Sequence, residues 1–174
     1  MARYIVTGAS GFIGRNLVAL LRDKGHQVLE ASRAKASSLD SGCIQFDLRV
    51  PTTIQNLIDA NADGLFHLAW GSTPGTAEDD IAEDLRSSVV GTIEMFERLT
   101  EHTQTKIVFA SSGGTVYGNA RNFPIVEDAP LAPLSAYGLG KASVENYAKH
   151  LRRRGADIRV VRVANPYGPG QAAS

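Results

Sequence analysis

The sequence is poor in cysteine, and its only one is Cys43. One cysteine excludes an internal disulfide framework and fits a protein of a reducing compartment. Because Ile44 and Phe46 are its neighbours, we expect Cys43 to be a small buried side chain rather than a nucleophile. No histidine and cysteine residues stand at ligand spacing, so no metal site is expected.

Long apolar runs and an excess of charge are also lacking. No segment is long enough for a signal peptide or a membrane span, so we expect a cytoplasmic protein with no membrane partner. Lysine plus arginine equals aspartate plus glutamate, at 18 each, which gives no support to a nucleic-acid partner. The one basic run, 152–154, precedes Gly155, where it favours the C-terminus of a helix.

Short β-branched runs alternate with helical patterns along the whole chain. The expected strands span residues 4–6, 27–29, 43–46, 65–68, 107–110 and 158–163. The expected helices span residues 12–24, a segment beginning at Pro51, 79–101 and 135–154. This alternation predicts an α/β fold, a Rossmann-type doubly wound parallel sheet of order 3-2-1-4-5-6, with ligands at the carboxyl ends of its strands. Residues 1–174 are expected to be one NAD(P)-binding domain.

A glycine-rich loop follows the first strand. Gly8 suits a sharp turn, Gly11 a close approach of backbone to a pyrophosphate, and Gly14 close packing of the next helix against the sheet. The N–H groups and dipole of that helix would hold the phosphates. The loop therefore predicts a dinucleotide site.

The end of the second strand bears on the choice of cofactor. An acidic residue there usually binds the adenosine ribose, but this sequence has Ser32 and Arg33. A hydroxyl and a guanidinium suit a 2′-phosphate, so NADP is slightly favoured over NAD. Two alternatives remain: Arg33 is a solvated loop residue, or Glu30 takes the acidic role.

Three side chains suit hydride-transfer chemistry. Tyr137 and Lys141 are four residues apart on one helix, and Ser112 follows the fifth strand. Tyrosine ionises near pH 10, so its pKa must fall by roughly three for it to act as a base near neutral pH. We expect Lys141, together with a cationic nicotinamide, to lower the pKa of Tyr137, and Ser112 to orient the substrate oxygen.

With these motifs, the chain resembles the N-terminal portion of the extended short-chain dehydrogenase/reductases, and specifically the NAD(P)-dependent epimerase/dehydratase family of nucleotide-sugar enzymes. The segments that carry the resemblance are 7–14, 47–48, 67–69, 116–118, Tyr137 with Lys141, and 165–170. The resemblance implies a nucleotide-sugar 4-epimerase with a catalytic set of Ser112, Tyr137 and Lys141. The cofactor contacts it implies are Gly8, Ser10, Gly11, Phe12, Ile13, Gly14, Ser32, Arg33, Asp47, Leu48, Leu68, Ala69, Tyr137, Lys141 and Pro166. Ser112 and Asn165 would contact the substrate.

Several departures leave alternatives open. Gly113-Gly114 makes the alignment of the serine ambiguous, with Thr115 as the alternative to Ser112, and it lowers the case for a dehydratase. Ser88 replaces the family's usual asparagine. A keto-sugar or ketone reductase using NADPH, and a non-catalytic NAD(P)H-binding module, are the competing functions.

The resemblance also implies a homodimer formed through the helices at 79–101 and 135–154. The C-terminal lobe that holds most of the sugar pocket is expected to be absent from this chain, so residues 1–174 alone should bind cofactor without turning over substrate. His67 is expected to be packed and hydrogen-bonded, the acidic residues at 79–84 to begin a helix, and Trp70 either to wall the active site or to fill the core.

Overall fold

Six parallel strands form the central sheet of the computed structural model, which describes residues 1–34, 42–120 and 122–171. The strands are β1 Arg3–Thr7, β2 Gln27–Ser32, β3 Cys43–Gln45, β4 Gly64–His67, β5 Lys106–Ser112 and β6 Ile158–Val163. Their order is β3-β2-β1-β4-β5-β6, as the sequence predicts, and every neighbouring pair is parallel. The doubly wound Rossmann-type sheet is therefore confirmed.

The register places apolar side chains in a row across the sheet. Leu29, Ile5, Leu65, Ile107 and Ile158 are successive partners on β2, β1, β4, β5 and β6, and all five are buried. Such continuous burial is typical of a parallel sheet covered by helices. The row belongs to the larger of two core clusters, which also contains Phe96, Leu99 and Leu151 of the covering helices.

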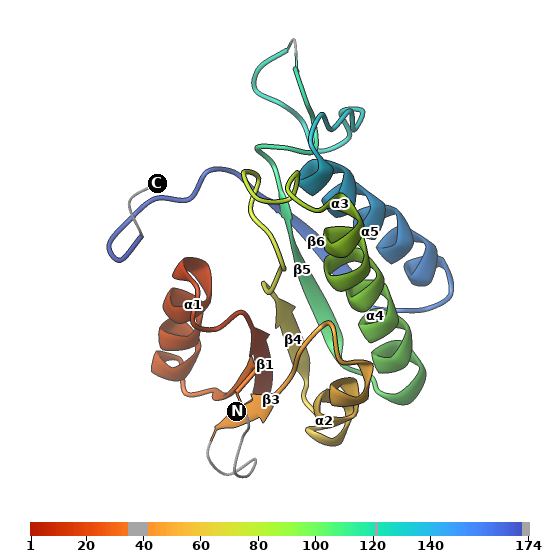
Figure 1. Cartoon of the computed structure of the whole chain (residues 1–174). Helices are drawn as coiled ribbons and strands as arrows, with labels where there is room; N and C mark the ends of the chain where they lie inside the picture. The colour runs from red at the N-terminus through yellow and green to blue at the C-terminus, as the bar shows by residue number, and fades with distance from the viewer. Residues whose placement is uncertain (35–41, 121, 172–174) are drawn as a thin grey trace.

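Helices cover the two faces of the sheet unequally. Their bounds are α1 Phe12–Asp23, the short 3-10 turn η2 Pro51–Thr53, α2 Ile54–Asp59, α3 Ile81–Asp84, the π-helical η3 Leu85–Val90, α4 Gly91–His102 and α5 Ala136–Arg153. Figure 1 shows α1 on one face and α2, α4 and α5 on the other. The face under α1 has only the smaller core cluster, built on Val6, Val18 and Val28.

The predicted helix ends are confirmed. Gly25 follows α1 with a φ of 75°, and Gly155 follows α5 with a φ of 102°, a region that glycine adopts without steric cost. Arg152 and Arg153 occupy the last turn of α5, where their positive charges interact favourably with the negative end of the helix dipole. At the other end of α5, the Ser135 hydroxyl caps the helix by accepting from the Gly138 N–H.

The helix expected at 79–101 contains a π-helical segment, and only some of its large apolar residues face the core. Ile81 and Leu85 are 56% and 50% exposed, whereas Val89 and Phe96 are buried. The reason is η3: a π-helical turn holds more residues than an α-turn, so it rotates the residues before it relative to those after it. Polar residues replace the expected apolar ones on the inner face, among them Asp84 and Ser88.

A smaller expectation also fails. Cys43 is exposed, because side chains alternate along β3 and Ile44 takes the core-facing side. On α1, Ile13 and Leu20 are exposed, and Val18 and Leu21 are the buried apolar residues. The apolar pattern of α1 is broader than the stripe that packs on the sheet.

The carboxyl ends of the strands lie beneath two long loops. The segment after β6 crosses from the end of the sheet toward α1 in Figure 1, where the Arg15 guanidinium donates to the Gly170 carbonyl. The loop after β5 rises beyond the same end of the sheet. Within the described residues, none of the helices combines the length and the apolar character that a membrane crossing requires.

Candidate active site

Two adjoining cavities lie over the carboxyl ends of the strands and share Gly8, Gly11, Leu68 and Trp70 in their walls. The first has a volume of about 500 Å³ and the second of about 330 Å³. The remaining predicted site residues divide between them. The first cavity, here the adenosine-side cavity, is lined by Ser10, Ser32, Arg33, Asp47, Leu48 and Ala69. The second, here the tyrosine-side cavity, is lined by Phe12, Ile13, Gly14, Ser112, Tyr137, Lys141, Asn165 and Pro166.

The glycine loop joins the two cavities. Gly8 turns with a φ of 69°, and a Cβ on it would lie 2.8 Å from the Ala69 nitrogen. A Cβ on Gly14 would overlap the Gly8 carbonyl oxygen. This glycine therefore lets α1 pack closely against the loop itself, whereas the sequence analysis expected close packing against the sheet. A Cβ on Gly11 would touch only that same oxygen, at 3.2 Å, and it would otherwise face the cavities.

The N-terminus of α1 opens on this loop. Gly11 is its N-cap residue, so no side chain caps the helix, and its first turn contains no acidic residue. The first N–H groups of a helix have no partner within the helix itself. Together with the positive end of the helix dipole, they form a favourable environment for a phosphate group.

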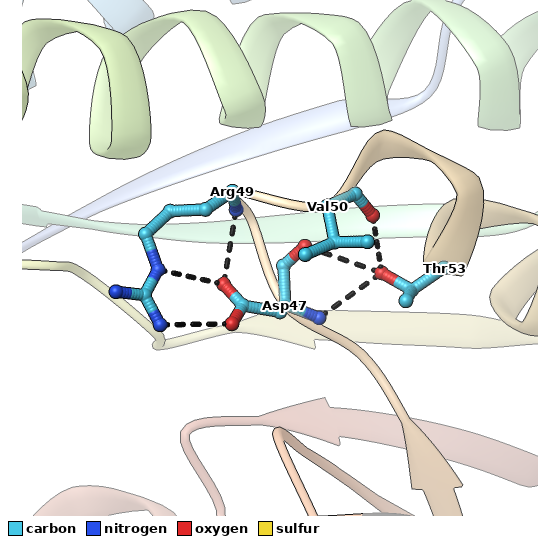
Figure 2. A network of polar contacts seen from close by, with 4 residues as sticks. All are labelled: Asp47, Arg49, Val50 and Thr53. Carbon is cyan, nitrogen blue, oxygen red and sulfur yellow. Dashed lines mark hydrogen bonds and ion pairs between the residues drawn. The ribbon is translucent and has the colours of Figure 1, made fainter.

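An arginine that the sequence analysis did not single out completes the adenosine-side cavity. Arg49 lines it beside Asp47, and Figure 2 shows both guanidinium and backbone groups of Arg49 directed at the Asp47 carboxylate. The Arg49 N–H and Nε donate to Asp47 Oδ1 at 3.0 and 3.2 Å, and Nη2 donates to Oδ2 at 2.9 Å. These bonds, with the charge of Arg33, hold the pKa of Asp47 below its usual value despite partial burial. The sequence signal that could have identified Arg49 is its place two residues after Asp47.

The backbone holds Asp47 in place from the other side. The Thr53 hydroxyl accepts from the Asp47 N–H at 3.0 Å and donates to the Val50 carbonyl at 2.7 Å (Figure 2). A carboxylate oxygen has about two acceptor positions. The two bonds to Oδ1 use both of its positions, and Oδ2 keeps one for a ligand.

The structure separates the two serines at the end of β5. Ser112 is the last residue of the strand and lines the tyrosine-side cavity with Tyr137 and Lys141. Ser111 also lines this cavity, but its hydroxyl is engaged by a hydrogen bond that it donates to Glu145 of α5. Thr115 does not line either cavity, and its hydroxyl is buried without a hydrogen-bond partner among the described residues. The position at the strand end therefore favours Ser112 over Thr115 as the hydroxyl beside the tyrosine.

Lys141 is buried, with 3% of its surface exposed. Its Nζ donates to the Ala110 carbonyl at 2.8 Å and lies 3.8 Å from the centre of the Trp70 ring. Burial lowers the pKa of Lys141 to about 7, although the carboxylates of Asp84 and Glu145 oppose this effect. An ammonium group with little water around it loses hydration, which the carbonyl and the ring only partly replace.

The pKa of Tyr137 differs from what the sequence led us to expect. We expected Lys141 to lower it, but in the protein alone the pKa of Tyr137 is raised, first by burial and then by the negative charge of Asp84. Lys141 Nζ lies 5.6 Å from the centre of the Tyr137 ring and is directed at the Ala110 carbonyl and Trp70. Burial and the Asp84 carboxylate therefore both disfavour the phenolate form of Tyr137.

Asp84, which is hydrogen-bonded to Ser88, is a functional candidate that the sequence analysis missed. The Ser88 hydroxyl donates to Asp84 Oδ1 at 2.7 Å and accepts from the Gly71 N–H at 3.0 Å. The expected start of a helix is seen at Asp80, whose carboxylate accepts from the Glu83 N–H, but Asp84 is buried next to Gly71 and Gly140. Its place in an acidic run, 79–84, concealed it.

His67 and Trp70 lie between the two cavities and the core. His67 is fully buried and bonded to the hydroxyls of Thr7 and Thr92 at 2.8 and 3.0 Å, which confirms the packed role. Burial, and secondarily the charge of Lys141, lower its pKa to about 3. Trp70 takes both expected roles, because it lines both cavities and packs on Phe109 with a ring separation of 6.0 Å.

Curated relatives of the chain are nucleotide-sugar enzymes. The chain is 35% identical to the UDP-glucose 4-epimerase of Mycolicibacterium smegmatis, over 97% of the chain and 58% of the relative. It is 32% identical to the dTDP-4-dehydro-6-deoxyglucose reductase of Escherichia coli, over 96% of the chain and 56% of the relative. The chain therefore spans somewhat more than half the length of these relatives.

Solved structures of the same kind superpose on the fold. A UDP-glucose 4-epimerase from Thermotoga maritima with UDP-glucose gives a TM-score of 0.87 at 27% identity, covering 98% of the chain and 58% of the other protein. A UDP-glucose 4-epimerase from Thermus thermophilus in complex with NAD gives 0.86 at 26% identity, covering 98% and 57%. RMD from Pseudomonas aeruginosa, complexed with NADPH, gives 0.82 at 27% identity, covering 99% and 57%.

The sequence pattern of one family extends over nearly the whole chain. It matches residues 4–174, which include the glycine loop, both cavities and the Tyr137–Lys141 pair. With the parallel sheet and the relatives above, this match identifies the chain as a member of the NAD dependent epimerase/dehydratase family.

Proposed function

We propose that residues 1–174 are the NAD(P)-binding domain of a nucleotide-sugar epimerase that acts as a 4-epimerase. The observation that carries the proposal is the shared tyrosine-side cavity, where Ser112, Tyr137, Lys141 and Asn165 come together next to the glycine loop. A pure nucleotide-binding module has no need of this set. The M. smegmatis and T. maritima relatives, both UDP-glucose 4-epimerases, support the choice of substrate class.

The residues present fit a dinucleotide. The helix N-terminus without a side-chain cap and the open side of Gly11 suit its pyrophosphate, and the free acceptor position on Asp47 Oδ2 suits an adenine amino group. Pro166 and Lys141 would lie along the nicotinamide end. The nicotinamide, when bound, supplies the carbon that accepts a hydride from the substrate and returns it.

Tyr137 has the central part in this mechanism. It would take the proton from the substrate hydroxyl as the sugar carbon is oxidised, and return it when the resulting carbonyl is reduced from the other side. Ser112 would donate a hydrogen bond to the same oxygen. Lys141 would bind the nicotinamide ribose and, once the positive nicotinamide is beside the phenol, help to stabilise the phenolate.

We also propose that NADP is preferred over NAD. Ser32 and Arg33 line the adenosine-side cavity at the end of β2, and Arg49 brings a second guanidinium to it. Two guanidinium groups and a hydroxyl suit a phosphate dianion, and no carboxylate stands at Ser32 to repel it. Glu30, the alternative acid, is instead held by an ion pair with Arg22 at 2.8 Å.

The two arginines of the adenosine-side cavity also favour a second candidate function, an NADPH-dependent keto-sugar reductase. The E. coli relative, a dTDP-4-dehydro-6-deoxyglucose reductase, supports this candidate. A reductase consumes its reduced cofactor once per turnover, whereas an epimerase leaves the total unchanged. The two functions are therefore distinguishable by stoichiometry.

The test is a panel of UDP-, GDP- and dTDP-sugars incubated with the complete protein, with and without added NADPH. Epimerised sugar at catalytic amounts of cofactor supports the first proposal, and NADPH consumption equal to product supports the second. Tyr137→Phe is the control, because it should abolish either activity and leave the cofactor site intact. Cofactor binding without turnover of any sugar in the panel would contradict both proposals.

We further propose a homodimer through the helices of 79–101, which are α3, η3 and α4, and through α5. Leu85, Val90, Leu139 and Tyr147 are all exposed apolar residues on these elements. Leu85→Glu should dissociate the dimer in light scattering, because a dimer interface does not tolerate an unpaired buried charge. Leu20→Glu on α1, with the same exposure of about half, is the matched control. Monomeric wild-type protein at micromolar concentration would contradict the proposal.

A further inference from the structure

Asp84 is a buried carboxylate beside the Tyr137–Lys141 pair, with 7% of its surface exposed. It ends α3, and two glycines border it: a Cβ on Gly71 would lie 4.0 Å from Oδ1, and a Cβ on Gly140 would lie 3.9 Å from Oδ2. Gly140 directly precedes Lys141 on α5, and the same Cβ would lie 3.2 Å from the Trp70 ring. Asp84, Trp70 and Lys141 thus form one cluster where α3 packs on α5.

The other carboxylate near Lys141 is already neutralised. Glu145 lies one turn further along α5, and both of its oxygens bind the Arg162 guanidinium of β6 at 2.7 to 3.1 Å. Ser111 donates to it as well. In contrast, no arginine or lysine among the described residues forms an ion pair with Asp84, whose one hydrogen bond comes from Ser88. Asp84 is therefore the uncompensated negative charge that faces Lys141.

We propose that Asp84 is a positioning residue that acts through Tyr137 and Lys141 and holds this pair in its proton-bearing state, ready to donate to a carbonyl oxygen. The step it would favour rests on the proposed function. As a hydride reaches the carbonyl carbon from the reduced cofactor, the Tyr137 hydroxyl gives its proton to the oxygen. A carbinol, a phenolate and the oxidised, positively charged nicotinamide would result, so charge and protons balance.

The sign of the effect follows from Coulomb's law in a site with little water. A negative charge makes loss of a proton less favourable for a phenol and for an ammonium alike, and Asp84 raises the pKa of both Tyr137 and Lys141. The other titratable groups near Lys141 are Glu145, which is paired with Arg162, and His67 on β4, which is neutral. Removing the charge of Asp84 therefore moves proton loss from the pair to lower pH.

The experiment follows the ionisation of Tyr137 in the complete protein. Ultraviolet difference spectra of protein with Tyr137 minus the matching Tyr137→Phe protein isolate the phenolate from the other tyrosines. We expect Asp84→Asn to move the Tyr137 titration to lower pH. Asp79→Asn is the control: it removes the same charge from an exposed residue of the same segment, where water screens it. Its titration should match the wild type.

Two further variants separate charge from structure. Ser88→Ala removes the hydrogen bond but keeps the Asp84 charge, so the shift to lower pH should not occur. If Asp84→Asn is unfolded by circular dichroism, Asp84→Ser offers a smaller neutral side chain with the same expected shift. An unchanged Tyr137 titration in the folded neutral variants, or an equal shift in Ser88→Ala, would overturn the proposal.

Activity gives a second readout that also tests the proposed function separately. If the protein turns over nucleotide sugars, the alkaline limb of kcat against pH, where the proton donor is lost, should move to lower pH in Asp84→Asn. A merely structural role would lower kcat by the same factor at every pH. Because the phenolate spectra need no substrate, a shifted titration without sugar turnover would support Asp84 and contradict the proposed function, and turnover without a shift would do the reverse.

Discussion

The two ends of the cleft present different kinds of group to a ligand. At the phosphate and adenosine end, these are backbone N–H groups at the start of α1 and the guanidinium groups of Arg33 and Arg49, which are exposed to water. At the tyrosine end they are side chains that include the buried Lys141, and the nearby Asp84 is also below one tenth exposure. Backbone groups are fixed by the fold, and exposed charges are screened, whereas buried charges interact strongly and shift one another's pKa.

This difference predicts how each end should respond to substitution. Changes of shape should matter most at the glycine loop, where there is no room for a side chain. Changes of charge should matter most at the Tyr137–Lys141 pair and least at the exposed arginines. The variants below test this order, from effects of about 100-fold on affinity or turnover down to a change of cofactor preference of about tenfold.

The glycine loop should be the more sensitive to shape. Gly14→Ala places a Cβ on the Gly8 carbonyl oxygen, so the loop or α1 must move. At about 1–3 kcal/mol for such overpacking, NAD(P) affinity should fall by up to about 100-fold. Quenching of Trp70, the single tryptophan, measures it. Gly25→Ala at the other end of α1 meets no atom within 4 Å and should cost stability but not affinity. Wild-type affinity in Gly14→Ala would remove the steric argument.

The tyrosine end should be the more sensitive to chemistry. Tyr137→Phe keeps the ring and loses the proton, so turnover in the complete protein should fall by about 10² or more with cofactor affinity nearly unchanged. Lys141→Met should damage both turnover and affinity, because it loses the proposed ribose contact as well. Steady-state kinetics and the Trp70 titration separate the two effects. Near-normal turnover in Tyr137→Phe would contradict the mechanism.

The free energy of unfolding below neutral pH should depend on the buried imidazole of His67. Burial lowers the pKa of His67 to about 3, against about 6.5 in the unfolded chain, so the unfolded state binds the extra proton first as pH falls. Between neutral pH and about pH 5 this linkage should cost about 2 kcal/mol of the free energy of unfolding. His67→Gln does not titrate, and denaturant unfolding should show a smaller loss. Equal losses in both proteins would show that His67 is not the group responsible.

The exposed adenosine end should give the smallest effect, a change of preference rather than a loss of function. Ser32→Asp places a carboxylate beside Arg33, which should repel a 2′-phosphate and shift the ratio of NADP to NAD affinity by about tenfold toward NAD. Arg49→Lys is a useful companion, because it keeps the charge and loses the paired contact with Asp47. Tighter binding of NAD than of NADP by the wild type would overturn the proposed preference.

Local sequence determined the sheet and the glycine loop. Strand order follows from alternating strands and helices, since right-handed parallel crossovers leave few other topologies. Gly8 and the end of α1 at Gly25 depend on backbone conformations that few other residues adopt, so the residue type itself carries the information. The pairing of Tyr137 with Lys141 on α5 is likewise a matter of helical spacing within one element.

Only the tertiary structure decided which charged groups of the site are buried and which of them interact. The sequence could not show that η3 turns Asp84 inward and Ile81 and Leu85 outward, because a π-helical turn has no signature in an apolar pattern. Nor could the sequence show that burial and Asp84 raise the pKa of Tyr137, or that Arg49 donates hydrogen bonds to the Asp47 carboxylate. Hydration and electrostatic interaction depend on which residues from distant segments exclude water together, and that depends on the packed fold.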